Sequence, residues 1–156
     1  MIYWFTGQPG HGKTVLAKGL IKILNNGAFH VDGDHLREIF ENKDYSESGR
    51  RKNIDLAQKI SHYLENQGND VVVSLVSPYR DQREDFKKMM VDSLVEIYVH
   101  TEEKRGREEF HVENYERPLE NFIDIDTTID EPEDSIIKIM SNEKLHSKSR
   151  QENIIK

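Results

Sequence analysis

The stretch GQPGHGKT at residues 7–14 decides the fold, and it directly follows the apolar run MIYWF at residues 1–5. It has the form G-x-x-x-x-G-K-[ST], the phosphate-binding P-loop, which is expected between a strand and a helix. The next ten residues place apolar side chains on roughly one helical face, namely Val15, Leu16, Leu20, Ile23 and Leu24. Motif, strand and helix agree, which argues against the alternative of a glycine-rich turn with a chance lysine.

In a P-loop, glycines let successive backbone N–H groups point at phosphate oxygens, and the helix N-terminus adds a partial positive charge. Lys13 is expected to reach the β- and γ-phosphates of a nucleotide, and the Thr14 hydroxyl is expected to bind Mg²⁺. His11 is expected to offer its backbone N–H. The predicted nucleotide-binding residues are Gly7, Gly10, His11, Gly12, Lys13 and Thr14. ATP and Mg²⁺ are the cofactors that this motif predicts.

The composition limits the classes of protein that the chain can represent. The 156 residues carry a net charge of −7 and contain no cysteine, so neither disulfides nor a cysteine-based metal site is expected. The acidic balance argues against a general nucleic-acid surface, although a local basic pocket stays open. No stretch has the length of a membrane span or the pattern of a signal peptide, so we expect a cytoplasmic protein with no membrane contact.

The chain predicts one kinase domain at residues 1–140 and a polar, loosely held tail at residues 141–156. Four further strands are expected at residues 28–31, 71–76, 94–99 and 122–126. Helices are expected between them and after Pro132, and the charged, aperiodic residues 101–117 are interpreted as a mobile segment. This alternation predicts a doubly wound α/β fold with a mainly parallel five-stranded sheet and helices on both faces.

Ligands of such folds bind outside the carboxyl ends of the strands, where several polar residues of this chain should meet. Asp34, after the second strand, could accept a proton from a substrate hydroxyl or hold Mg²⁺ through water. Asp32 is an equally good candidate for a helix cap. Ser77 and Arg80 follow the third strand.

Arginines near this edge suit bidentate contact with oxyanions, and Arg37, Arg50 and Arg80 are candidates. Arg50 and Asn53 would share a helical face, and Tyr45 could stack on a base or make a small hydrophobic contact. The seven histidines show no metal-ligand spacing. Some cations are interpreted as solvated surface charges, namely Arg51, Arg83, Lys87 and Lys88.

Several motifs together resemble the adenylylsulfate kinase family, which phosphorylates the 3′-hydroxyl of adenosine 5′-phosphosulfate with MgATP. They are GQPGHGKT at 7–14, DGDHLR at 32–37, YS at 45–46, RRKNI at 50–54, SPYR at 77–80, YERP at 115–118 and DT at 126–127. The family usually shows D-G-D-N-x-R, F-S-x-x-D-R-x-E-N-I and S-P-x-R at the corresponding places. The resemblance covers about residues 1–140.

The resemblance implies Asp34 beside the substrate hydroxyl, Arg37, Arg50 and Asn53 around the phosphosulfate and ribose, and Tyr45 beside the substrate base. Ser77 matches a serine sometimes proposed as a phosphate carrier. Phe110 matches the lid phenylalanine that closes on the base. The family also tends to dimerise, which implies a homodimer.

The chain departs from the family pattern at His35, Tyr45 and Gly49, and in a shortened lid at residues 101–110. The lysine expected two residues before Phe110 is Glu108, so the lid's positive charge would come from Lys104, Arg105 or Arg107.

The favoured hypothesis is an adenylylsulfate kinase, with Lys13, Asp34 and Ser77 as the catalytic residues. A second hypothesis keeps the kinase but changes the acceptor to another nucleotide or to a hydroxyl of modified nucleic acid, which a more open cleft could admit. A third is a non-catalytic nucleotide-binding switch, against which the arginines around Asp34 argue.

Overall fold

The computed structural model describes residues 1–24 and 27–154, with side chains as far as residue 143. The strands are β1 (Ile2–Thr6), β2 (Phe29–Asp32), β3 (Val71–Ser74), β4 (Leu94–His100) and β5 (Phe122–Asp126). The helices are α1 (Lys13–Ile23), α2 (Gly33–Ile39), α3 (Glu47–Asn66), α4 (Arg80–Met89) and α5 (Pro132–Ile154), with a short 3₁₀ turn, η1 (Glu108–Phe110).

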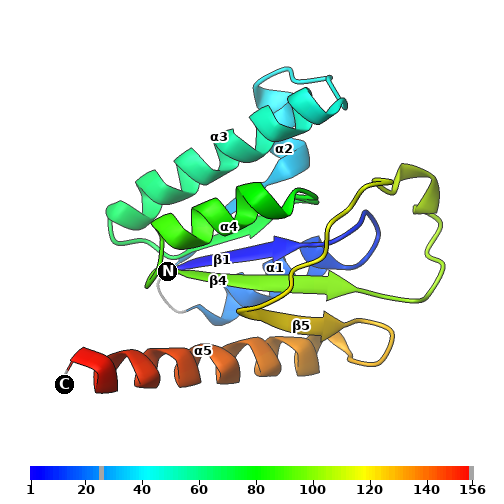
Figure 1. Cartoon of the computed structure of the whole chain (residues 1–156). Coiled ribbons are helices and arrows are strands. Elements are labelled where there is room, and N and C mark those ends of the chain that lie inside the picture. Colours follow the sequence, from blue (N-terminus) through cyan, green and yellow to red (C-terminus); the bar gives the residue numbers. More distant parts are fainter. Residues whose placement is uncertain (25–26, 155–156) are drawn as a thin grey trace.

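The strands form one parallel sheet in the order β2-β3-β1-β4-β5, so all of their carboxyl ends lie at one edge (Figure 1). The first strand lies in the middle, between β3 and β4. This position explains why its five residues are all buried, since a central strand of a parallel sheet is covered on both faces. The P-loop therefore leaves the sheet from its centre.

Alternate residues of the strands β1 and β3 pack into two separate hydrophobic cores. One core packs Tyr3 and Phe5 against α1 and α5, and the other packs Ile2 and Trp4 against α2, α3 and α4. In β4 the residues Val95, Ile97 and Val99 face the first core, so the period of two turns Glu96 toward the α4 side. Figure 1 shows the resulting layers, with α3 and α4 on one side of the sheet and α5 on the other.

The predicted doubly wound α/β fold is confirmed, and the sheet is wholly parallel. Helix α5 runs as far as Ile154, across the predicted domain boundary at residue 140. The division into domain and tail stays a prediction. Among the described residues, no helix is long and apolar enough to cross a membrane.

Candidate active site

The P-loop turns sharply because its glycines adopt backbone angles that other residues avoid. Gly7 has φ +152°, and a Cβ atom at this position would lie 2.1 Å from the Val99 carbonyl oxygen at the end of β4. Gly12 is left-handed, with φ +101°, and it precedes the first residue of α1. The predicted phosphate cradle thus lies where β1, β4 and α1 meet.

Lys13 is the first residue of α1, and its side chain is buried, with 8% exposed. Its Nζ donates to the Gln8 carbonyl oxygen at 2.8 Å, so the ammonium folds back over the loop that would hold phosphates. Burial lowers the pKa of Lys13 to about 8, although Asp34 and Asp32 partly offset the effect. The lysine is thus poorly solvated and only partly neutralised, which suits it to bind a phosphate anion.

The two acidic residues after β2 have different surroundings. Asp32 caps α2, because its Oδ1 accepts hydrogen bonds from the backbone N–H groups of Asp34 and His35. Its Oδ2 accepts a hydrogen bond from the Ser74 hydroxyl at 2.9 Å. Asp34 is exposed in the first turn of α2 and close enough to Lys13 for its charge to raise that lysine's pKa. Of the two, Asp34 is the carboxylate that is available to a ligand.

A magnesium site fits these residues if nucleotide phosphates and water complete it. Thr14 is exposed on the first turn of α1, beside Lys13, and Asp34 offers an exposed carboxylate. A hydroxyl and a carboxylate are oxygen ligands of the kind that Mg²⁺ takes, usually while it keeps several waters. Within the described part of the chain no cluster of three or more His, Cys, Asp or Glu residues could hold a metal by itself.

Arg37 organises the loop between α2 and α3. Its Nη1 donates to the Asn42 carbonyl at 3.1 Å and to the Asp44 carbonyl at 2.9 Å. The guanidinium also stacks on the exposed Tyr45 ring, 4.2 Å from its centroid. Arg37 and Tyr45 therefore form one unit, in which the arginine fixes the loop that carries the aromatic ring.

Gly49 explains how this loop packs so closely on α3. A Cβ atom at Gly49 would lie 2.1 Å from the Asp44 carbonyl oxygen. The Asn42 side-chain amide donates to the Gly49 carbonyl at 3.0 Å, which fixes the loop from the other side. Gly49 is one of the positions where the chain departs from the family pattern. A glycine is required there because the backbone of the neighbouring loop lies so close.

Asn53 and Arg50 lie one turn apart on α3, but only Asn53 has a partner. The buried Asn53 amide donates to the Gly33 carbonyl at 3.2 Å, directly beside Asp34 in the chain. Its Oδ1 is buried and has no hydrogen-bond partner among the described residues. The half-buried Arg50 guanidinium makes no hydrogen bond or ion pair with any residue that the structure describes, so it is free to meet an anion.

Ser77 lies just beyond β3 in a left-handed conformation, with φ +44°, which is uncommon for a residue other than glycine. The side chain is buried, with 1% exposed, and its Oγ has no partner among the described residues. Its carbonyl oxygen accepts hydrogen bonds from the Thr6 hydroxyl and from Arg83. Ser77 therefore borders the start of the P-loop, where Gly7 donates its N–H to Val76.

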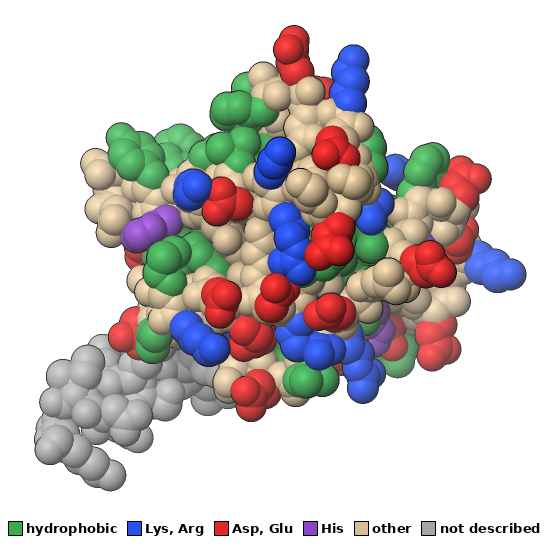
Figure 2. All heavy atoms as spheres, turned by 45° about the horizontal axis from the view of Figure 1, so that its top comes forward, with side chains coloured by type: hydrophobic (Ala, Val, Ile, Leu, Met, Phe, Trp, Pro, Cys, Tyr) green, Lys and Arg blue, Asp and Glu red, His purple; other side chains and the backbone are tan. Residues whose placement is uncertain are grey.

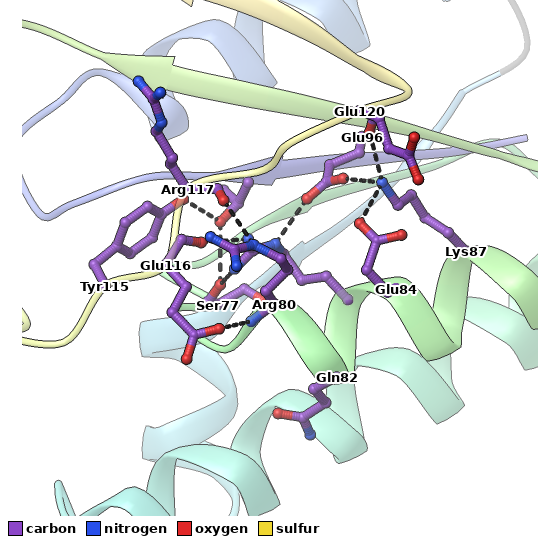
Figure 3. A network of polar contacts seen from close by, with 12 residues as sticks. Ser77, Arg80, Gln82, Glu84, Lys87, Glu96, Tyr115, Glu116, Arg117 and Glu120 are labelled. Atoms are coloured by element: carbon purple, nitrogen blue, oxygen red, sulfur yellow. Dashed lines mark hydrogen bonds and ion pairs between the residues drawn. The ribbon is translucent and has the colours of Figure 1, made fainter.

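Arg80 contacts the chain segment that follows the lid. Its Nε donates to the Arg117 carbonyl at 3.0 Å, and its backbone N–H donates to a Glu116 carboxylate oxygen at 3.0 Å (Figure 3). In this structure the predicted acceptor-binding residue therefore holds the chain segment that follows the lid.

The interpretation of Arg83 and Lys87 as solvated surface charges is wrong. Arg83 is 2% exposed and pairs with the equally buried Glu96, its Nε lying 2.7 Å from Oε1. Lys87 pairs with the other Glu96 oxygen at 2.6 Å and with Glu84 at 2.7 Å. The signal was present in β4, whose otherwise apolar LVEIYV contains Glu96, a carboxylate that needs a cation when buried. Arg51 and Lys88 agree better with the interpretation, since Arg51 is about a third exposed and Lys88 is exposed.

The later part of residues 101–112 contacts the P-loop. The Gln8 side chain accepts a hydrogen bond from the Val112 N–H and donates to the Val112 carbonyl, both at 2.8 Å. His111 Nε2 lies 3.2 Å from the Pro9 carbonyl oxygen. The segment that its charged, aperiodic sequence marked as mobile thus has defined contacts with the loop it would cover.

Arg107 is a lid cation that lies against the P-loop and acts on Lys13. A Cβ atom on Gly10 would lie 2.9 Å from the Arg107 Cβ, and the Arg107 charge contributes to lowering the Lys13 pKa. Arg105 is instead paired with Glu103 and donates to Thr127, whose hydroxyl donates to the His11 carbonyl. Phe110 is 57% exposed, with the Arg107 guanidinium 5.4 Å from its ring centroid.

Sequence reasoning missed Gln8 and Arg83. Gln8 contacts a residue that lies 104 positions later in the chain, and Arg83 contacts one that lies 33 positions later. No local pattern reports contacts of that separation.

The family model described as adenylylsulphate kinase matches residues 1–140. The chain belongs to this family. Among its relatives, a cytidine diphosphoramidate kinase of Campylobacter jejuni is 28% identical, and the match covers 87% of this chain and 84% of that protein. An adenylyl-sulfate kinase of Staphylococcus carnosus is also 28% identical, over 92% of this chain and 76% of that protein.

The fold agrees with solved members of the family. The Mycobacterium tuberculosis adenylylsulfate kinase, in a structure with AMPPNP and adenosine 5′-phosphosulfate, superposes with a TM-score of 0.76 at 21% identity, over 90% of this chain and 95% of that one. Family membership identifies the chain as a kinase, a phosphotransferase that uses a nucleotide.

Proposed function

We propose that this kinase transfers the γ-phosphoryl group of ATP to the 3′-hydroxyl of adenosine 5′-phosphosulfate. The observation that carries the proposal is the placement of Asp34, an exposed carboxylate within electrostatic reach of Lys13. A base beside a phosphate-binding lysine is what in-line transfer to a hydroxyl requires, because the reaction depends on positioning and charge stabilisation.

Each step can be assigned to residues of this chain. Lys13 and the P-loop amides hold the β- and γ-phosphates, and Thr14 and Asp34 would hold Mg²⁺, which neutralises developing negative charge. Asp34 orients the acceptor hydroxyl and receives its proton as the oxygen attacks the γ-phosphorus. The bond from that phosphorus to the β,γ-bridging oxygen breaks, and ADP leaves with this oxygen.

The acceptor is proposed to lie between α2, α3 and the lid. Arg50, which is free, and Asn53, which is anchored to Gly33, would meet its sulfate and ribose oxygens. Tyr45 and Phe110, both exposed, would close on its base. Arg107 would supply the positive charge of the shortened lid.

Ser77 and Arg80 receive positional roles in this proposal. Direct transfer between bound groups needs no phosphorylated serine, and Ser77 has only 1% of its surface exposed. The proposal keeps both residues at the wall of the acceptor site, where Ser77 adjoins the P-loop and Arg80 holds residues 116 and 117.

A second acceptor, cytidine diphosphoramidate, is favoured by one observation. The Campylobacter jejuni relative that carries this name matches 84% of its own length to this chain. Acidic and basic side chains are interspersed on the face that Figure 2 shows, which favours a small acceptor over a nucleic acid. A homodimer remains a prediction from the family resemblance.

The test is product formation with MgATP and a panel of acceptors, namely adenosine 5′-phosphosulfate, cytidine diphosphoramidate and adenosine 5′-phosphate. We expect the 3′-phosphorylated sulfate nucleotide, lost at least about 100-fold in Asp34→Asn and retained in Glu38→Gln, an exposed carboxylate on the same helix. Preference for the cytidine acceptor would establish the second candidate. ADP release with no phosphorylated acceptor would overturn both and point to hydrolysis or another hydroxyl.

A further inference from the structure

Three cations on one face of α4 hold the backbone that returns from the lid to β5. Arg83 donates to the Glu116 carbonyl. Arg80 donates to the Arg117 carbonyl and Lys87 to the Glu120 carbonyl (Figure 3). Their spacing of three and four residues places all three side chains on the same side of the helix. We call residues 115–120 the return segment.

Arg83 differs from the other two because it also reaches the acceptor edge of the sheet. Its Nη1 donates to the Ser77 carbonyl, its Nη2 to the Glu116 carbonyl and its Nε to Glu96. One planar guanidinium therefore joins Ser77, which lies three residues beyond β3, to the return segment and to β4. An ammonium group has no such fixed fork, so a lysine at this position could not hold the three acceptors in the same geometry.

The return segment is in turn tied to the start of the P-loop. The Tyr115 hydroxyl lies 2.8 Å from the Thr6 hydroxyl, which donates to the Val76 carbonyl and also contacts that of Ser77. The Glu116 N–H donates to the Pro78 carbonyl at 2.9 Å. The end of the lid, the residues after β3 and the last residue of β1 thus form one continuous polar network around Arg83.

A buried ion pair is a costly way to gain stability, since a well-packed apolar pair of similar volume is often as stable or more so. Arg83 and Glu96 are each 2% exposed. What an apolar pair could not do is donate hydrogen bonds to the buried Ser77 carbonyl and the partly buried Glu116 carbonyl and set their separation. The network therefore points to placement of the backbone rather than to stability.

We propose that Arg83 is a positioning residue that fixes the return segment of the lid relative to Ser77, so that the closed lid meets the acceptor in one geometry. It touches no substrate and acts through the Ser77 and Glu116 carbonyls. The expected effect on kinetics rests on the proposed acceptor site. The tethering of the return segment by Arg83 does not depend on that site.

The variants are Arg83→Lys, which keeps the charge, and Arg83→Met with Glu96→Leu, which removes the buried pair together. Lys87→Met is the matched control, because Lys87 also pairs with Glu96 and reaches the return segment but does not contact Ser77 or Glu116. Steady-state kinetics with ATP and the preferred acceptor are measured well below each variant's melting temperature, and amide hydrogen exchange is measured without any substrate.

For Arg83→Lys we expect kcat/KM for the acceptor to fall about 10- to 100-fold and KM for ATP to change by less than about twofold. The double variant should show the same kinetic loss. Lys87→Met should stay within about twofold of wild type in both constants.

Amides of residues 112–117 should exchange at least about tenfold faster in Arg83→Lys, with those of β1 unchanged and with no such change in Lys87→Met. This arm needs no acceptor, so it distinguishes failure of the tether from failure of the proposed function. Wild-type acceptor kinetics in the double variant would overturn the proposal, as would an equal loss in Lys87→Met or unchanged exchange in Arg83→Lys.

Discussion

The P-loop and the segment that covers it border the same site, but they are held in place by different kinds of interaction. The P-loop is shaped locally, by glycines with positive φ and by the Lys13 bond to a carbonyl five residues earlier. The lid and its return segment are held by long-range bonds, such as those of Gln8 to Val112 and of Arg83 to Glu116. The part of the site that would bind ATP, the ATP half, is therefore determined by local sequence. The part that would bind the acceptor, the acceptor half, depends on partners far along the chain.

This difference predicts that variants of the two halves have different effects on the steady-state kinetics. The P-loop acts on the phosphoryl group itself, so its variants should lose transfer with every acceptor. Variants of the acceptor half should lose one acceptor and spare the use of ATP.

The largest effect is expected for Lys13→Met, which removes the ammonium that would stabilise the transferring phosphoryl group. Transfer should fall at least about 100-fold. The melting temperature should stay the same or rise, because burial that lowers the Lys13 pKa to about 8 also disfavours the charged folded form. Kinetics and thermal unfolding on one preparation check both parts. Activity within tenfold of the wild type would contradict the P-loop assignment.

A smaller and more selective loss is expected for Arg50→Ala. Its guanidinium has no partner among the described residues, so we expect it to bind the acceptor anion, and kcat/KM for the acceptor should fall about 10- to 100-fold. The affinity for ATP should change by less than about threefold. Arg51→Ala is the control, since Arg51 is already paired with Glu47 and Asp81. Equal losses for ATP and acceptor would remove Arg50 from the acceptor site.

What could be predicted from the sequence also differs between local features and long-range contacts. The strands, the parallel sheet and the P-loop were predictable because short apolar runs that alternate with helical segments, and an eight-residue motif, record them locally. The rule for strand ends predicted that Asp34 lies at the ligand-binding edge, and the family resemblance added Asn53. Only the structure shows that Asp32 is a cap and that Arg37 holds the loop carrying Tyr45.

The cations of α4 show why the rest was not predictable. Arg83 and Lys87 have the same composition and spacing as solvated residues of any amphipathic helix. Their burial depends on Glu96, which lies in a strand that follows the helix. A glutamate inside an apolar strand was the available signal, but the sequence does not show which cation pairs with it.

Gly49 tests whether the acceptor half depends on close backbone packing. Alanine normally stabilises a helix over glycine by up to about 1 kcal/mol, but at Gly49 its Cβ would lie 2.1 Å from a backbone oxygen of Asp44. We expect Gly49→Ala to destabilise the fold by about 1–3 kcal/mol and to raise KM for the acceptor. Denaturant unfolding and acceptor kinetics measure the two effects.

The control is Gly19→Ala in α1, where the new Cβ would meet the flexible end of the Ile136 side chain. The change in unfolding free energy there should be within about 1 kcal/mol and KM should not change. Similar results at both glycines would mean that the loop of residues 42–45 moves freely.

The smallest effect is expected at His11, where the P-loop contacts the lid through the edge-to-face ring of His111, 5.2 Å between centroids. Burial, with Lys13 and His111 nearby, lowers the pKa of His11 to about 4. The unfolded chain therefore binds this proton first, and stability from His11 is lost as pH falls from about 6.5 to 4. Since His11 is only half-buried, we expect about 1 kcal/mol, measured as the difference between wild type and His11→Gln in unfolding free energy at pH 7 and pH 4.5. A difference that stays constant over this range would show that His11 titrates normally, and that the lid does not desolvate the P-loop at this point.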